Sequence, residues 1–594
     1  MDDIYEPLTQ YRDALRDKHA ENAAALFDRL SQDSGIDIPA NKRTVGEIRA
    51  LETELAAETA RRDRWRALNV FCIVAVVVVG ALLAYALYCS SQGEEVPAPP
   101  AGIATAIAAL VLGVLSSVFG CAPRLRAAAE RIASLQERRN ALETEAWEQM
   151  APLNALFDWG QPAALLHQTA PRIEVDPYFS EGRLRDLERS FGWDGSFNRS
   201  RSVIFSHSGE INGNPFVVAQ VLSCRMTRKT YHGSLPISWR ETITDANGNR
   251  QTITRHQVLH ASVEKPFPTY PEEKVLLYGN DAAPDLTFSR QPSPLSDAGD
   301  TAFGRWRVRS EIKRLEKFSR NLDDDSNYTI MANREFEALF HATDRSDEVQ
   351  FRLLFTPLAQ QQMVRLLKDR EVGYGDDFCF RKDHRVNIIV PEHLQGQRID
   401  TDPAQFRSYD WASARRAFLS FNAEFFRGLY FALAPLLSIP LYQQTRTHET
   451  IYGTRADRAS SFWEHEALAN FYGDARFRHP SCVTRSLLKT CAADAPDGSR
   501  RVDVTAYGHR AVERTDYVSV WGGDGRMHDV PVNWTEYLPV QRTSPLSLVE
   551  TDNLTLQDYQ SRLADTSAER PDLPCPWDPR TVASLFRRSI VSRL

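Results

Sequence analysis

Two long apolar runs near the start of the chain dominate its hydrophobic pattern. Residues 69–88 and 102–121 contain no charged side chain, and each approaches the ~20 residues that a helix needs to cross the hydrocarbon core of a bilayer. Residues 89–101, which separate the two runs, are too few to form a domain. The pattern predicts a transmembrane helical hairpin over 67–121.

The charged residues around the hairpin predict its orientation. Arginines gather at both outer ends of the hairpin, namely Arg61, Arg62, Arg64 and Arg66 before it and Arg124, Arg126 and Arg131 after it. The connecting loop carries Glu94 and Glu95 but no Lys or Arg. Because Lys and Arg in short flanks favour the cytoplasmic side, we expect both termini to be cytoplasmic.

Polar segments with helical spacing of apolar residues adjoin the hairpin on both sides. Apolar positions recur every three or four residues over 45–65 and again over 125–146. Two helices that enter and leave the same membrane face can pair as an antiparallel coiled coil. We therefore expect a cytoplasmic stalk, with its first part at 1–66, including an amphipathic helix near 5–31, and its returning helix at 122–160.

From about residue 200 the hydrophobic period changes from that of a helix to that of a strand. The predicted elements are strands at 203–206 and 216–222 with a turn at 212–214, a hairpin formed by 237–243 and 252–263 around a turn at 245–249, and a helix near 303–321. Short segments of β-branched and aromatic residues separated by Asn-Gly turns are typical of antiparallel sheet. They predict a β-rich domain over 180–325.

Two further regions follow the β-rich domain. An α+β domain is expected over 328–425, with a helix at 335–340, a strand at 349–355, a helix at 357–369 and strands at 378–381 and 386–390. A C-terminal α/β region is expected over 426–543, with strands at 502–507, 517–521 and 530–532, before a tail over 544–594 that ends in a helix. The predicted fold class is α+β, with mixed cytoplasmic domains after the transmembrane hairpin.

A third apolar run, 428–442, invites interpretation as another membrane span. It holds only about fifteen residues, fewer than a span needs, and it contains Pro435 and Pro440, which disfavour a continuous helix. We expect a buried or interfacial segment there.

Composition excludes some classes of function. The net charge is −7, and no basic stretch interleaved with aromatic residues suggests a nucleic-acid partner. The eight cysteines are scattered and form no CxxC pair, so the sequence supports neither a zinc ribbon nor a thioredoxin-like site. We expect no metal and no cofactor.

The weak candidates for catalysis are Glu464, His465 and Glu466, which lie together on a predicted helix. The cluster could orient a proton donor, but His465-Glu466 lacks the second His of a zinc-protease helix, and a polar face without catalytic role is favoured. Residues 521–528 form the densest glycine cluster. A strand is predicted on either side of it, which favours a hairpin turn over a phosphate-binding loop.

Several stretches resemble a known bacterial family. They are 208–224, 260–270, 333–369 and 380–394, and they include the block Phe336, Glu337, Phe340, Thr356, Pro357 and Leu358. These stretches are similar to the bacterial domain of unknown function 3137 family over roughly 200–400. The resemblance implies two N-terminal membrane spans and a cytoplasmic β-rich region, and it places the chain in the bacterial inner membrane as a multi-pass protein. It implies no activity.

The favoured interpretation of the sequence is a membrane-anchored cytoplasmic binding or scaffolding protein. Its expected partners are the lipid bilayer, further copies of the same chain in a homo-oligomer, and a protein ligand. The alternatives are a membrane-tethered enzyme, with the residues around His465 and the 521–528 turn as its site, and an oligomeric pore whose spans line a channel.

Overall fold

The computed structural model describes residues 5–91, 100–244, 250–296, 301–320, 328–446, 459–494, 500–550, 586–587 and 590–593. The chain divides into two compact units. A helical unit comprises Ala25–Phe157 and Ala404–Phe418, and a mixed unit comprises Met1–Ala24, Asp158–Pro403 and Leu419–Leu594. The combination of helices and sheets agrees with the predicted α+β class.

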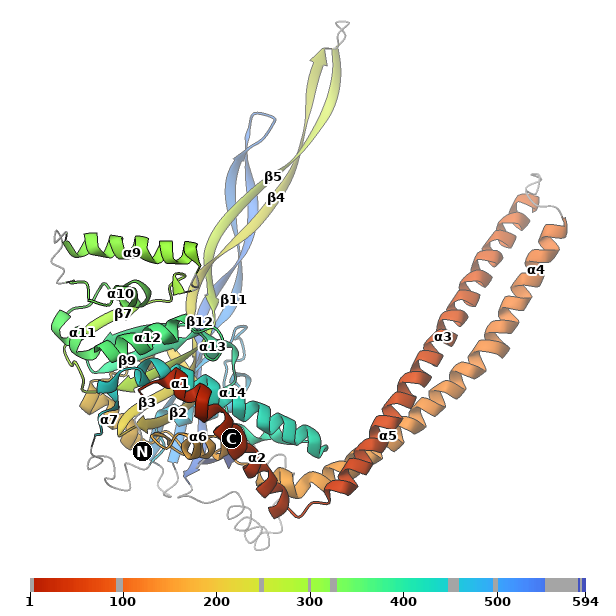
Figure 1. The fold of residues 1–594 in the computed structure, drawn as a ribbon. Coiled ribbons are helices and arrows are strands. Elements are labelled where there is room, and N and C mark those ends of the chain that lie inside the picture. The colour runs from red at the N-terminus through yellow and green to blue at the C-terminus, as the bar shows by residue number, and fades with distance from the viewer. Residues whose placement is uncertain are drawn as a thin grey trace. The chain divides into compact units, whose positions relative to one another are not determined.

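Two long antiparallel helical arms form most of the helical unit. One arm is α3 (Ile38–Ser91), and the other runs through α4 (Pro100–Leu115), the π-helical turn η2 (Ser116–Cys121) and α5 (Ala122–Leu156). The two arms lie side by side along the apolar segments and beyond them (Figure 1). Both are long and apolar enough to cross a membrane, which agrees with the two predicted spans.

Small residues bring the two arms into close contact. A Cβ added at Gly113 would lie 2.7 Å from the Val76 side chain, so only glycine fits there without a shift. Beyond the apolar segments, the Gln149 amide donates to the Thr44 hydroxyl at 3.0 Å. The helices pair as the stalk hypothesis requires, while coiled-coil packing between them stays a prediction.

A seven-stranded antiparallel sheet forms the centre of the mixed unit, in the order β1-β2-β3-β6-β9-β8-β7. Its strands are β1 (Ile173–Val175), β2 (Arg201–Ile211), β3 (Asn214–Ser223), β6 (Glu272–Gly279), β7 (Thr287–Arg290), β8 (Phe378–Asp383) and β9 (Val386–Pro391). Strands from 180–325 and from 328–425 therefore share one sheet, and these two predicted domains lie in one folded unit.

The alternation of side chains along each strand gives this sheet two apolar faces. In β3, Phe216 and Val218 lie in one hydrophobic core, whereas Val217 and Ala219 lie in the other. The helices that contribute to these cores are α6 (Gln161–Thr169), α7 (Glu181–Phe191), α10 (Arg334–Phe340), α11 (Glu348–Leu354), α12 (Pro357–Lys368), α13 (Glu392–Gly396), α14 (Trp411–Leu437) and α15 (Phe462–Tyr472).

The N-terminal segment belongs to the mixed unit. It consists of α1 (Pro7–Gln10), the π-helical turn η1 (Tyr11–Leu15) and the start of α2 (Arg16–Asp33). Tyr11 is buried against Tyr430, with ring centroids 5.3 Å apart, and the Tyr430 hydroxyl donates to the carbonyl of Pro7. The third apolar run is buried in the same core, as predicted, although α14 continues through Pro435 to Leu437.

Two long hairpins complete the mixed unit. The first pairs β4 (Arg225–Thr244) with β5 (Arg250–Thr269). The second pairs β11 (Arg500–Trp521) with β12 (Met527–Glu550) in a five-stranded sheet that also contains β10 (Leu487–Asp494), β13 (Phe586–Arg587) and β14 (Ile590–Arg593). The four hairpin strands β4, β5, β11 and β12 contain 20 to 24 residues each, far more than the usual five or six.

Two sequence-based predictions differ from this architecture. Residues 349–355, predicted as a strand, form helix α11, because Asp347 caps the helix by accepting from the Gln350 amide and because Phe351 and Leu354 point into the core at helical spacing. Where the predicted tail is described, at 544–550, 586–587 and 590–593, it is strand, and the last two segments replace the predicted terminal helix. The strands predicted at 502–507, 517–521 and 530–532 are confirmed as parts of the longer strands β11 and β12.

Candidate interaction surface

The two long hairpins pack on each other along their length and form a pair of β-ribbons (Figure 1). We call the β4–β5 hairpin the first ribbon and the β11–β12 hairpin the second ribbon. In the first ribbon, half-buried and exposed residues alternate from Tyr231 to Trp239, and apolar and polar residues alternate from Leu259 to Val263. Alternation places one apolar face toward a neighbour and one polar face toward solvent.

A charged and aromatic cluster joins the middle of the two ribbons. The Lys265 ammonium lies 2.5 Å from a carboxylate oxygen of Asp516 and 4.4 Å from the centre of the Trp534 ring. The Trp534 indole N–H also donates to Asp516 at 2.9 Å. Lys265 and the Trp534 hydrogen bond hold the pKa of Asp516 below its usual range. The cluster therefore fixes the lateral position of one ribbon on the other.

Glycines permit the closest approaches between the ribbons. A Cβ at Gly233 would lie 2.1 Å from the carbonyl oxygen of Pro531. Near the turn of the second ribbon, the backbone N–H of Gly523 donates to the Gln257 side chain at 2.7 Å, and a Cβ at Gly523 would meet the Trp239 ring. A larger residue at either glycine would force the ribbons apart.

Polar contacts connect the bases of the two ribbons. The Tyr270 hydroxyl lies 2.8 Å from Nδ1 of His509 and 2.9 Å from the Thr484 hydroxyl. Burial raises the pKa of Tyr270 and lowers the pKa of His509, so both side chains are held neutral near pH 7. Arg485 donates to Glu272 at 2.7 Å beside them.

Large apolar side chains remain exposed on the second ribbon although the pair buries its inner faces. Tyr517 is 70% exposed, Trp521 65% and Met527 51%. Trp521 and Met527 are paired residues across the strands, and Tyr517 lies on the same face as Trp521, four residues along the strand. The three exposed side chains therefore lie on one face near the end of the ribbon, with Ser519 and Asp529 between Tyr517 and Trp521, and we call these three residues the tip patch.

Long strand edges are also left open. Within the described residues, β4 and β5 pair only with each other, and β11 from Gly508 onward pairs only with β12. An open edge presents unpaired backbone N–H and C=O groups to another strand. Exposed aromatic residues and open edges together are typical of a protein-binding surface.

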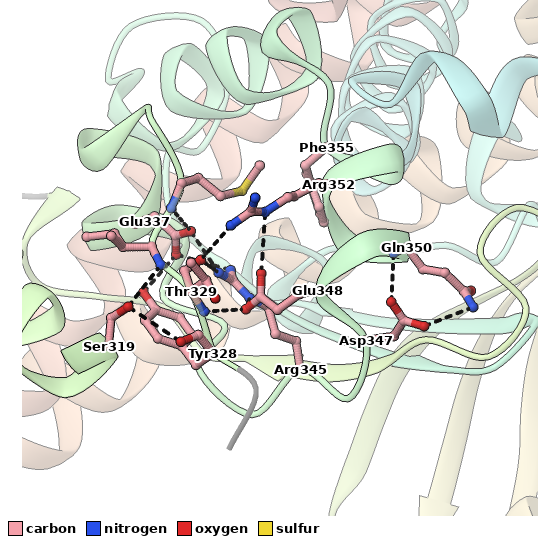
Figure 2. A network of polar contacts seen from close by, with 12 residues as sticks. Ser319, Tyr328, Thr329, Glu337, Arg345, Asp347, Glu348, Gln350, Arg352 and Phe355 are labelled. Atoms are coloured by element: carbon pink, nitrogen blue, oxygen red, sulfur yellow. Dashed lines mark hydrogen bonds and ion pairs between the residues drawn. The ribbon is translucent and has the colours of Figure 1, made fainter. Parts of the chain in front are cut away.

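A buried polar network surrounds Glu337, one of the residues on which the family resemblance rests. The network is distant from the ribbons in sequence. The Glu337 carboxylate accepts from Arg345 at 3.0 Å, from the Tyr328 hydroxyl at 3.1 Å and from the Met331 amide at 3.0 Å (Figure 2). Arg345 also donates to Glu348 at 2.6 Å. Burial raises the pKa of Tyr328, so its hydroxyl stays protonated as a donor.

The neighbouring motif residues also stabilise the fold. Phe336 and Phe340 stack with ring centroids 5.0 Å apart in the core, and the Thr356 hydroxyl accepts from the Ala359 amide at the N-terminus of α12. These contacts connect α10, α11 and α12 to the loop before them. The roles that the structure gives to this block are structural.

The predicted candidates Glu464, His465 and Glu466 are all buried on α15. Glu464 accepts from the Phe179 amide at 3.0 Å, and Nε2 of His465 lies 3.1 Å from the Ser460 hydroxyl. Glu466 pairs with Lys489 at 2.6 Å and accepts from the Val203 amide. Burial raises the pKa of Glu466. The Glu466 contacts join α15 to β2 and β10.

The other candidate, the 521–528 segment, is the turn of the second ribbon, as the favoured interpretation predicted. The Gly522 amide donates to the Arg526 carbonyl across the turn, and His528 contacts Asp524 at 3.0 Å. The base of β11 packs near α15 through Val504 and Leu468, whereas the turn begins at Trp521. About 17 residues of extended strand, or about 50 Å, separate the two, so they do not form one site.

The paired ribbons were not predicted as a site. The signal that could have found them is the alternation over 231–239, which begins before the predicted hairpin at 237. Among the described residues, no group of three or more His, Cys, Asp or Glu could hold a metal ion.

Comparison with known proteins identifies no relative of this chain. No family model, no curated protein and no solved structure matches the sequence or the fold.

Proposed function

We propose that this chain is a membrane-anchored scaffolding protein that assembles with further copies of itself through its paired β-ribbons. The observation that carries the proposal is the tip patch of Tyr517, Trp521 and Met527, exposed beside open strand edges. In the single chain these side chains are mostly exposed. Burial of such a patch in a protein contact is the usual reason for its presence.

Anchoring in a bilayer is the second part of the proposal. The apolar windows of the two long helices are 0% and 6% buried within the protein, and their exposed residues include Phe71, Leu112 and Phe119. A soluble unit would leave this large apolar surface in water at high cost. We propose a multi-pass protein of the bacterial inner membrane, similar in plan to the domain of unknown function 3137 family.

Connectivity supports the orientation with both termini in the cytoplasm. The chain leaves the mixed unit after Ala24, passes through the helical unit and returns to the mixed unit at Asp158. Since one folded unit receives both ends of the hairpin, the two ends lie on the same side of the membrane. The arginine-rich flanks favour the cytoplasm for that side.

A second copy of this chain is the proposed occupant of the ribbon surface. A strand edge can pair with the same edge of an identical strand around a twofold axis, which gives a closed, self-complementary contact. The tip patches of the two copies would then be buried together, and water would be excluded from Trp521 and Tyr517.

Light scattering on the full-length protein extracted in detergent tests the proposal. We expect a mass of two or more chains, and we expect Y517S/W521S/M527T to reduce that mass to a single chain. The matched control is V349S/L353S, which makes the same kind of change at exposed apolar positions on α11 and leaves the assembly intact. A monomeric wild-type protein, or a triple variant that still assembles, would overturn the scaffold.

A further inference from the structure

Helix α9 (Ala302–Arg320) carries a strongly basic surface that the proposed scaffold does not use. Its cations are Arg305, Arg307, Arg309, Lys313, Arg314, Lys317 and Arg320, against the acidic residues Glu311 and Glu316. Arg314 pairs with Glu311 at 2.9 Å, and Arg334 pairs with Glu316 at 2.8 Å. Within the described residues, Lys313 and Lys317 have no ion pair, so this face carries positive charge that is not neutralised.

The same face of α9 exposes aromatic side chains. Phe303 is 68% exposed and Trp306 62%, and their rings stack with centroids 5.9 Å apart. Phe303, Trp306, Ser310, Lys313 and Lys317 recur every three or four residues, so they form one stripe along the helix.

The opposite face of α9 attaches the helix to the mixed unit. Leu315 is buried, and Val308 packs against the main core. One polar contact adds to this attachment, because Nε2 of His341 lies 3.1 Å from a carboxylate oxygen of Glu311. The inner face of α9 therefore packs against the mixed unit, and the stripe on its outer face is exposed to solvent.

Positively charged side chains also line a cavity under α9. It measures about 220 Å³ and is lined by Arg305, Arg309 and Lys368 together with Glu335 and apolar side chains that include Leu339. Within this lining, Glu335 pairs with Lys368 at 3.2 Å.

We propose that α9 binds the surface of an anionic lipid bilayer, with Phe303 and Trp306 inserted at the headgroup level and Lys313 and Lys317 against lipid phosphates. A basic helix with aromatic residues on its exposed stripe is typical of a helix that lies in the membrane interface, and aromatic rings favour that depth. The inference rests on the proposed membrane anchor, which keeps a bilayer at high effective concentration near the mixed unit.

Photo-crosslinking of the full chain in lipid nanodiscs tests this inference and the anchor separately. A benzophenone amino acid is placed at Ser310 on the stripe of α9 or, in a second sample, at Val78 in the first apolar segment. Each protein is reconstituted with phosphatidylcholine alone or with an equal mixture of phosphatidylcholine and phosphatidylglycerol. Mass spectrometry then identifies the crosslinked molecule.

We expect Val78 to crosslink lipid in both nanodiscs and Ser310 to crosslink lipid only where phosphatidylglycerol is present. K313Q/K317Q should weaken the Ser310 lipid crosslink by about fivefold or more for each lysine removed. The matched control R240Q/R510Q removes two exposed cations from the ribbons and should leave the crosslink unchanged.

Three other outcomes have defined meanings. A Val78 crosslink to lipid without any Ser310 crosslink to lipid would overturn the α9 inference and leave the anchor standing. A Ser310 crosslink to protein or nucleic acid, independent of phosphatidylglycerol, would overturn the inference in favour of that occupant. No lipid crosslink at Val78 would overturn the anchor and, with it, the inference that depends on it.

Discussion

At the scale of single residues, the buried ion pair of Glu337 and Arg345 tests whether the residues on which the family resemblance rests stabilise the fold. The side chain of Arg345 is 0% exposed and that of Glu337 2%. E337Q keeps the shape but removes one of the two carboxylates that balance Arg345, the other being Glu348, and removing one partner of a buried pair is strongly destabilising. We expect a loss of about 3 kcal/mol in the free energy of unfolding, measured by urea denaturation.

The comparison variant for this prediction is R352Q. Arg352 contacts Glu348 at 3.7 Å but is 48% exposed, and exposed pairs contribute little to stability. We expect a change below about 0.5 kcal/mol. Equal losses for the two variants would contradict the structural role that we assign to Glu337.

Lys382 is a second residue with a measurable consequence. Its ammonium is buried and donates to the carbonyls of Ala282 at 3.0 Å and His384 at 2.6 Å. Burial lowers the pKa of Lys382 from its ordinary 10.5 to about 7. Between these two values the unfolded chain holds a proton that the folded chain lacks, so stability rises with pH across this window and is lowest below about pH 7.

We therefore expect K382M to flatten this pH dependence. The wild-type protein should gain up to about 1.4 kcal/mol per pH unit from Lys382 between about pH 7 and about pH 10, whereas K382M should lack this contribution. Urea denaturation of both proteins across this range measures the difference. A wild-type-minus-variant difference that does not increase with pH would show that Lys382 titrates normally in the folded chain.

At the scale of elements, the ribbon pair depends on the close approach at Gly233. The Lys265–Asp516 contact of 2.5 Å allows a carbodiimide to join the two side chains as an amide. We expect this crosslink in the wild-type protein and a loss of most of it in G233V, because the added side chain meets the Pro531 carbonyl. Peptide mass spectrometry measures the yield.

The neighbouring variant S234V provides the control for the crosslinking experiment. Ser234 lies on the exposed face of the first ribbon, so valine there should leave the crosslink intact. Retention of the crosslink in G233V would contradict the packing of the two ribbons.

Helix α11 illustrates where local patterns were ambiguous. Residues 349–355 contain alternating apolar residues that favour a strand, but Phe351, Leu354 and Phe355 also have helical spacing. The structure buries these three residues in the main core. Tertiary packing against Phe336 and Phe340 therefore decided between two patterns that a short segment satisfies equally.

At the scale of the whole molecule, the connectivity of the two units predicts the membrane topology. In cells, a cysteine at position 94, introduced as E94C with native Cys89 replaced by Ser, should react with a thiol reagent that cannot cross the inner membrane. The native Cys491, which is exposed on the mixed unit, should react only after permeabilisation. The reverse pattern would contradict a cytoplasmic mixed unit.

The candidate interaction surface was largely beyond the reach of the sequence. Alternation predicted a hairpin between 237 and 263, and the structure confirms it as part of a longer ribbon. The pairing of this ribbon with another more than 200 residues later depends on contacts such as Phe267 with Tyr537, whose ring centroids lie 5.3 Å apart. Periodicity within one segment carries no information about which distant segment covers its apolar face.

The sequence by itself determined the two apolar helices, the α+β class and most individual elements from β2 to β9, because local hydrophobic period and turn residues specify these features. Only the tertiary structure decided that strands from two predicted domains share one sheet and that residues 1–24 belong to the mixed unit. The burial of Glu464, His465 and Glu466 was likewise decided by the tertiary structure. Long-range packing decides such matters, since the free energy of burying a side chain depends on partners that are remote in the chain.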